Sequence, residues 1–316
     1  MIFEFTKSNG EIAVKYNPSY VYINYQLSTP ADSLTAVFNS GEFDDYKYVR
    51  VIYDEKIIFT GVVDLVKTVI NKNGISQRVE CRSMAGCLLD NQLMPQNIQN
   101  ITDTVIYQHY LKPYNISVNK LTNKPLKEVL NITKGQSVYT LLSRYSSKVH
   151  NAQPRINQYG IAVLDGNINS NSFVFTNGFN SFDDNCYSCT EITVQHKRCG
   201  VISKVFVRNT LNETGYGLTV ENKKAESRGI SAVRYLDATP SSGNCIYDAN
   251  RIINNSNKEL LTITVKCPCI VFNPLGGSAK VIADEQYYEN LEINNISYIY
   301  STSGVFTTIT MNEREI

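Results

Sequence analysis

Alternating apolar and polar residues run through the first hundred positions and predict a series of short β-strands. Ile12, Val14 and Tyr16 alternate with polar neighbours, which is the period-2 pattern of a strand. Runs rich in β-branched and aromatic residues follow at 20–25, 48–53, 57–63 and 76–81. The pair Asn73-Gly74 favours a tight hairpin between the last strands. A strand about every ten residues predicts a sandwich or barrel.

Helical spacing first appears after residue 83. Ser83 is expected to cap a short helix that ends near Asp90. Residues 98–190 then predict a small α/β unit, in which Thr102-Asp103 begins a helix that Pro113 ends. A second helix starts at Ser137 and carries apolar residues at helical spacing. Strands at 160–164 and 172–176, separated by an Asp165-Gly166 turn, complete the unit.

Strand patterns return from residue 191. They cover 191–194, 201–207, 261–265, 278–282 and 304–311. A helix over about 245–260 interrupts them and places Ile246, Ala249, Ile252 and Ile253 on one face. The segment 211–244 is rich in Thr, Asn, Ser and Gly, and this composition predicts a long loop or extended excursion.

The predicted fold class is therefore α+β and mainly β, with barrel-like or sandwich-like domains at both ends. A first β domain covers 1–97, an α/β insert domain covers 98–190, and a second β domain with the helical excursion covers 191–316. The two β domains are similar in length, so a diverged duplication is one explanation of this plan.

Composition excludes several classes of protein. The chain has 316 residues, 42% of them hydrophobic and 19% charged, as in globular proteins. Its 30 basic and 29 acidic residues give a net charge of +1, which excludes nucleic-acid binding through bulk positive charge. No apolar run approaches the ~18 residues of a membrane span. The first residues lack a secretion signal, so we expect a soluble protein made in the cytoplasm.

Eight cysteines raise the question of a metal site. They are Cys81, Cys87, Cys186, Cys189, Cys199, Cys245, Cys267 and Cys269. Cys186 and Cys189 have zinc-ligand spacing, but Cys267-Pro-Cys269 is too tight for the second half of a structural site. On a strand, Cys267 and Cys269 would point to one face. Reduced structural thiols are therefore the favoured interpretation, with no metal and no cofactor.

Other catalytic patterns are weak, so we predict no enzyme and no catalytic residue. The three histidines are His109, expected as a packed or surface residue of a helix, His150, expected at a helix C-terminus, and His196, expected at a solvated strand end. The acidic pairs Asp44-Asp45 and Asp183-Asp184 are adjacent in sequence, unlike the separated carboxylates of glycosidases. Gly276-Gly277 follows Pro274 in a hairpin-like turn and opens no helix, so it makes no phosphate loop.

Tyrosine is unusually abundant, with 21 residues and no tryptophan. The clusters are Tyr16, Tyr20, Tyr22 and Tyr25 near one end of the chain, and Tyr287, Tyr288, Tyr298 and Tyr300 near the other. Exposed tyrosines favour protein interfaces, while β propensity in an AT-rich genome explains the count equally well. Aromatic platforms also stack on sugars, so a carbohydrate-binding module remains a hypothesis.

The order of the segments resembles that of phage baseplate hub proteins. The stretch 56–64, a hairpin and 78–90 resemble the family's first domain, with matching positions at Gly61, Arg82-Ser83, Gly86 and Leu88-Leu89-Asp90. The helix at 135–145 before the strand at 160–165 fits, as do 248–251, 261–265, 274–277 and 293–298. The resemblance covers most of the chain, except 211–244. It is closest to hubs of Firmicute contractile tails, defective prophages and R-type bacteriocins.

The resemblance implies a mechanical role. Such hubs form a homotrimer in which two similar β domains per chain build a pseudo-six-fold ring, which joins a six-fold tail tube to a three-fold spike. The implied partners are the central spike, the tail tube or tube initiator, the tape-measure protein and other baseplate components. DNA or tape-measure protein would pass through the ring of an assembled virion or tail-like particle. The alternatives are a tail-associated receptor- or carbohydrate-binding module and a cell-wall-degrading accessory.

Overall fold

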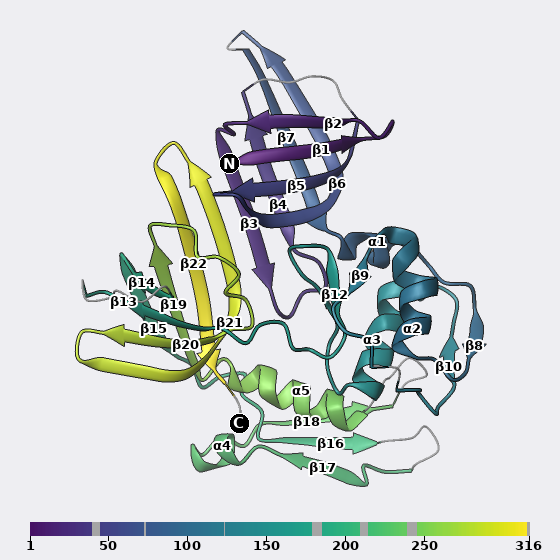
Figure 1. The fold of residues 1–316 in the computed structure, drawn as a ribbon. Helices are drawn as coiled ribbons and strands as arrows, with labels where there is room; N and C mark the ends of the chain where they lie inside the picture. Colours follow the sequence, from purple (N-terminus) through teal and green to yellow (C-terminus); the bar gives the residue numbers. More distant parts are fainter. Residues whose placement is uncertain are drawn as a thin grey trace.

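The computed structural model describes residues 1–39, 45–72, 74–122, 124–178, 185–208, 214–238 and 245–314. One 14-stranded sheet dominates it, with three smaller sheets and a few helices (Figure 1). The predicted α+β, mainly β fold class is confirmed. No helix in the described ranges is both long and apolar enough to span a membrane.

The N-terminal part of the large sheet is a curled half-barrel with the strand order β3-β4-β7-β6-β5-β1-β2. Its strands are β1 (Ile2–Lys7), β2 (Ile12–Tyr16), β3 (Tyr20–Gln26), β4 (Ser33–Phe38), β5 (Tyr46–Tyr53), β6 (Lys56–Asn71) and β7 (Gly74–Ser83). Phe3, Phe5 and Phe38 pack edge to face or stacked in its core. The predicted hairpin is confirmed, because Asn71 pairs with Gly74. Asn73 itself lies outside the described residues.

The C-terminal part of the same sheet has the order β15-β19-β22-β21-β20-β13-β14. Its strands are β13 (Ser172–Thr176), β14 (Cys186–Ser188), β15 (Glu191–His196), β19 (Leu261–Cys267), β20 (Ser278–Ala283), β21 (Gln286–Ser301) and β22 (Gly304–Glu313). The sequence pattern grouped β13 and β14 with the insert. In the structure β13 pairs with β20 and β14 pairs with β13, so both strands belong to the large sheet. The pairing of β21 with β3 joins both parts into one sheet.

The insert packs its helices over a second hydrophobic core. Its elements are α1 (Ala85–Asp90), β8 (Gln96–Ile98), α2 (Asp103–Ile106), a π-helical turn (Tyr107–Leu111), a 3-10 turn (Lys112–Tyr114), β9 (Ser117–Val118), β10 (Leu130–Ile132), α3 (Val138–Val149), β11 (Arg155–Ile156) and β12 (Ile161–Val163). Two predicted caps are confirmed: Thr102 accepts from the Val105 amide, and Ser137 accepts from the Thr140 amide.

Two predictions for the insert are wrong. Ser83 does not cap α1, because it ends β7 and its hydroxyl accepts a hydrogen bond from the Asp32 amide instead. Pro113 does not end the helix that starts at Asp103. It sits in the first positions of the 3-10 turn, where the missing proline amide needs no partner, and the left-handed residue Asn115 ends the segment.

A second excursion leaves the sheet between β15 and β19. It contains β16 (Lys204–Arg208), β17 (Leu218–Glu221), α4 (Lys223–Ser227), β18 (Val233–Asp237) and α5 (Cys245–Asn257). Of the two predictions for 211–244, the long loop is wrong for the described residues, which form an excursion with two strands and a short helix. The sheet β17-β16-β18 buries Val205 and Val207 together with Ala249 and Ile253 of α5, a tertiary contact that local composition does not report. On α5, Ala249 and Ile253 are buried, while Ile246 in the first turn is 45% exposed.

Candidate functional site

The two halves of the large sheet are structural repeats of one unit. The order β3-β4-β7-β6-β5 matches β15-β19-β22-β21-β20. Adding 230 to the bounds of β6 and β7 gives the bounds of β21 and β22. The bulges after Val63 and Ile293 also correspond. The match weakens at the outer strands, since β1 runs antiparallel to β5 whereas β13 runs parallel to β20. The duplication considered from chain length is thus visible in the topology.

Weak signals of this repeat are present in the sequence. Asp54-Glu55 and Asp284-Glu285 are 230 residues apart and make equivalent turns, and Gly74 and Gly304 have φ of +117° and +120° at the hairpin tips. Only residues without a Cβ adopt such backbone angles at little cost. The strands between these turns share few identical residues, so in the sequence the repeat is visible only at the turns.

Inside the chain, the two units meet edge to edge along β3 and β21, side by side in Figure 1. The strands pair antiparallel from Tyr20 opposite Ser301 to Gln26 opposite Asn295. The Tyr25 and Tyr298 rings lie 5.9 Å apart across this joint. The Tyr25 hydroxyl donates to the Ile58 carbonyl and the Tyr298 hydroxyl donates to the Val271 carbonyl. Burial raises the pKa of both tyrosines, so both remain neutral donors.

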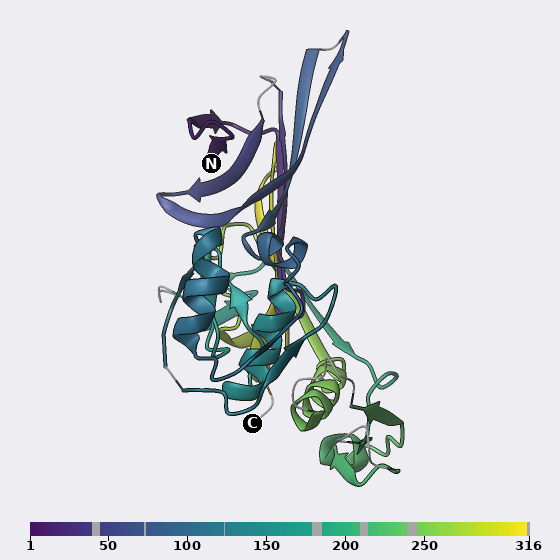
Figure 2. The same cartoon turned by 90° about the vertical axis from the view of Figure 1, so that its right-hand side faces the viewer.

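The counterparts of these two strands are open edges. In the described part of the chain, β15 pairs with β19 alone, and β5 follows β6 only as far as Val62. The outer part of β6 exposes apolar side chains, with Leu65 46%, Val69 42% and Ile70 63% exposed. Figure 2 shows the β6–β7 hairpin projecting beyond the rest of the molecule. Open strand edges with apolar residues are templates for pairing with another chain.

Strand β2 also has an open edge among the residues that the structure describes. Its apolar residues Ile12, Val14 and Tyr16 are 64%, 44% and 62% exposed. The inward positions are taken by Ala13 and Lys15, whose Nζ donates to Gln77 Oε1 at 2.5 Å. The alternation that predicts this strand is real, but its apolar face points outward.

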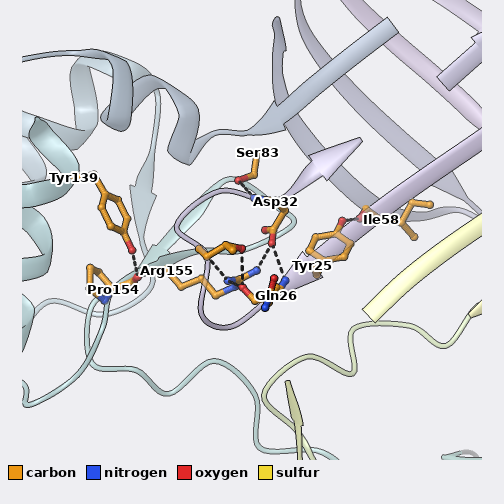
Figure 3. A network of polar contacts seen from close by, with 9 residues as sticks. Tyr25, Gln26, Asp32, Ile58, Ser83, Tyr139, Pro154 and Arg155 are labelled. Carbon is orange, nitrogen blue, oxygen red and sulfur yellow. Dashed lines mark hydrogen bonds and ion pairs between the residues drawn. The ribbon is translucent and has the colours of Figure 1, made fainter. Parts of the chain in front are cut away.

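A buried ion pair fixes the insert against the sheet (Figure 3). Arg155 of β11 reaches the loop after β3, donates to the carbonyls of Gln26 at 2.8 Å and Thr29 at 3.3 Å, and pairs with Asp32. The two charged residues are 4% and 2% exposed. Burial raises the pKa of Asp32 to about 6, although the Arg155 charge and hydrogen bond oppose this rise. The pair joins segments 123 residues apart.

A second polar cluster lies inside the insert. Asp103 accepts hydrogen bonds from the amide and hydroxyl of Thr122, both at 2.6 Å, and from the Tyr145 hydroxyl at 2.7 Å. His150 Nε2 lies 2.9 Å from the same carboxylate. Burial raises the pKa of Asp103, but these hydrogen bonds outweigh it and leave the pKa below its ordinary value.

Replacing Asp103 with Asn should make stability less dependent on acid pH. A carboxyl group whose pKa is lowered on folding stabilises the protein above its unfolded pKa of about 4, and this contribution disappears as the pH falls through the folded value. We expect Asp103→Asn to lower the free energy of unfolding by about 2–3 kcal/mol at pH 7 and by less below pH 4. Urea unfolding at both pH values measures this. A constant difference would contradict it, and Asp165→Asn in a surface turn is the control.

The cysteines of the considered zinc site come only partly together. Cys189 and Cys267 are buried with their Sγ atoms 3.6 Å apart, and their hydrogen bond lowers the pKa of Cys189. Cys269 is exposed, because β19 ends at Cys267, so the prediction that both point to one face is wrong. Among the described residues, no three His, Cys, Asp or Glu side chains are grouped as metal ligands.

The remaining candidate residues are dispersed. His109 and His196 are exposed, and His150 ends α3 with its ring toward Asp103. Gly277 donates to the Pro274 carbonyl in the predicted turn. Asp45 accepts from Ser8, while Asp44 and Asp183-Asp184 lie outside the described residues. The tyrosines divide between surface and core: Tyr16 and Tyr287 are more than 60% exposed, and Tyr25 and Tyr298 are buried.

A large polar cleft of about 1260 Å³ lies between the insert, α5 and the sheet. Amide side chains line much of it, including Asn151, Asn169, Asn250, Asn254 and Asn294. Amides donate and accept hydrogen bonds without charge, so they suit contacts with uncharged polar groups. No sequence pattern marked this cleft, because its walls come from segments that lie far apart in the chain, from Gln26–Pro30 to residues 310–314.

Comparison with known proteins gives a consistent picture of the fold. No protein-family model matches the chain, and no curated protein does. The 43 kDa tail protein of prophage MuSo2 from Shewanella oneidensis matches with a TM-score of 0.76 at 14% identity, over 98% of each chain. A tail protein from Neisseria meningitidis MC58 matches with a TM-score of 0.72 at 15% identity, over 98% of this chain and 96% of that one. The fold is that of phage tail proteins.

A more distant match lies in a secretion system. A component of the E. coli type VI secretion system, which is structurally similar to the T4 bacteriophage tail proteins gp27 and gp5, matches with a TM-score of 0.53 at 10% identity. The match covers 95% of this chain and 74% of that one. Phage tails and this secretion system thus share the fold described above.

Proposed function

We propose that this protein is a structural hub of a tail baseplate, a homotrimeric ring that joins a six-fold tail tube to a three-fold spike. The observation that carries the proposal is the structural repeat: each chain holds two similar β units joined edge to edge by β3 and β21. Three chains would supply six such units, which is the symmetry match that an adapter needs. The likeness to phage tail proteins supports a place in a tail.

The proposed partners are those of an adapter. They are the central spike, the tail tube or its initiator, the tape-measure protein and other baseplate components. The nearly equal numbers of acidic and basic residues suit a channel that DNA or tape-measure protein passes without sticking. The role is structural and not enzymatic, within a Firmicute contractile tail or R-type bacteriocin assembled after synthesis in the host cytoplasm. The proposed domains are 1–97, 98–190 and 191–316, and β13 and β14 of the second range are shared with the large sheet through their pairing to β20.

The solution mass tests this proposal. Light scattering of the purified protein at several concentrations should give three times the 35.6 kDa of one chain, and negative-stain images should show three-fold rings. A strict monomer, even after co-expression with the adjacent spike protein, would overturn the hub. The carbohydrate-binding alternative would then lead, since Phe206 and Tyr235 stack 5.3 Å apart on the open face of β16–β18 and Tyr235 is 64% exposed.

A further inference from the structure

The two open strand edges are the repeat counterparts of the two strands that join the units within one chain. Strand β15 corresponds to β3, and β6 corresponds to β21. The outer half of β21 pairs with β3, whereas the same half of β6 has no neighbour on that side in the described structure. Each chain therefore carries both halves of a second joint like the one it already contains.

We infer that β15 of one chain pairs antiparallel with the outer half of β6 of the next chain, repeating the β3–β21 joint between copies. The strand registers within each unit show which residues are equivalent in the two repeats. Each residue of β3 corresponds to the residue 171 positions later in β15, and each residue of β6 corresponds to the residue 230 positions later in β21. Transferred to the new joint, the β3–β21 register places Ile192 opposite Ile70, Thr193 opposite Val69 and Val194 opposite Thr68. Gln195 then faces Lys67, and His196 faces Val66.

This register brings matching chemistry together. Ile192, Val194, Val66 and Ile70 would share one face of the joint, as Val21, Ile23, Ile296 and Tyr298 do within the chain. Val21 and Ile23 are at most 1% exposed there, while Ile70 is 63% exposed in the single chain. The same register places Glu191 opposite Asn71, so the charged residues Glu191 and Lys67 both face neutral side chains. A one-residue slip would turn every apolar side chain to the wrong face.

The edge strand β2 is a competing surface, and the repeat argues against it. Its positional counterpart, β14, takes no part in the joint between β3 and β21. By the same equivalence, β2 should take no part in the joint between chains. Ile12 on β2 is 64% exposed, against 63% for Ile70, so the two positions form a matched pair for mutation.

The contact is head to tail, because β15 and β6 are different strands. Such contacts close into a ring or extend into a filament, depending on the rotation between copies. The inference rests on the proposed trimer, for which the rotation closes after three copies. It names the partner of each edge as a second copy of this chain, not another tail component.

Charged substitutions at the matched positions give the first test. Ile70→Asp should abolish the trimer seen by light scattering and leave a folded monomer with an unchanged circular dichroism spectrum, since the side chain is exposed in the single chain. Ile12→Asp should keep the wild-type mass. A trimer that survives Ile70→Asp, or that both variants disrupt equally, would overturn the assigned joint.

Disulfide trapping tests the register itself. Thr193→Cys combined with Val69→Cys should give covalent trimers on a non-reducing gel after diamide oxidation, because these side chains are expected to face each other on the same side of the joint. Thr193→Cys combined with Thr68→Cys puts the thiols on opposite sides and should not. Wild-type protein and the single variants report background from native thiols such as Cys199 and Cys269, which are exposed.

The outcomes separate this inference from the hub proposal. A wild-type trimer that does not crosslink through Thr193→Cys and Val69→Cys keeps the hub and overturns the β15–β6 joint. A wild-type monomer overturns both. Crosslinked trimers that form only when both cysteines are present support the hub proposal and the β15–β6 joint, and they place the interface on these two strands.

Discussion

Replacing Arg155 with Met should destabilise the protein by about 3–5 kcal/mol, because it leaves the Asp32 carboxylate buried without its cation. The two side chains are 5% and 1% exposed, so water replaces little of the lost interaction. Arg155 also donates to the Gln26 and Thr29 carbonyls, which would lose these partners. The insert would be held less firmly against the sheet. Urea unfolding at pH 7 measures the loss of stability.

The pH dependence of this variant gives a sharper test of the same contact. Burial already raises the pKa of Asp32 to about 6 from an unfolded value of about 4, and removing Arg155 should raise this pKa further. A raised carboxyl pKa makes the folded state less stable as the pH rises through that range. The loss caused by Arg155→Met should therefore be smaller at pH 4 than at pH 7.

A matched control separates the buried ion pair from ion pairs in general. Arg50 pairs with Glu4 on the outer face of the sheet, where the side chains are 49% and 25% exposed. Exposed pairs contribute at most about 1 kcal/mol, so Arg50→Met should have a small effect. If both variants lose equal stability, the Arg155–Asp32 pair does not hold the insert in place.

Adding a methyl group at Gly61 should be nearly as damaging, at about 3 kcal/mol. A Cβ at this position would lie 2.1 Å from the Arg82 carbonyl oxygen of the neighbouring strand and 2.7 Å from the Phe59 ring. Backbone of a paired strand cannot move aside without breaking the ladder between β6 and β7. The glycine of the motif that resembles hub proteins thus has a direct physical reason.

The control for this variant is Gly217→Ala, where the added Cβ meets nothing within 4 Å. Its effect should stay within about 0.5 kcal/mol. Thermal or urea unfolding compares the two variants. Equal stability of Gly61→Ala and wild type would show that β6 and β7 separate more easily at the hairpin base than the structure indicates. Because Gly61→Ala is expected to disturb the ladder between β6 and β7, we expect this variant also to assemble less well through the outer half of β6.

The sequence by itself determined the local elements. Alternation predicted most strands, Asn73-Gly74 predicted the hairpin, and Thr102 and Ser137 predicted two helix starts. These features depend on backbone preferences and on caps within three or four residues, so neighbouring residues are sufficient to reveal them. The mainly β class and the two similar ends follow from the same local patterns.

Only the tertiary structure decided which strands pair and which faces are covered. It placed β13 beside β20 and β14 beside β13, packed β17 and β18 against α5, and turned Ile12 and Tyr16 outward. It also brought Arg155 to Asp32 and built the polar cleft, and among the described residues it left β15 and the outer half of β6 with an open edge. Each of these results from contacts between segments far apart in the chain. Strand pairing satisfies backbone groups almost independently of side-chain identity, so a local sequence pattern specifies a strand without specifying its neighbour.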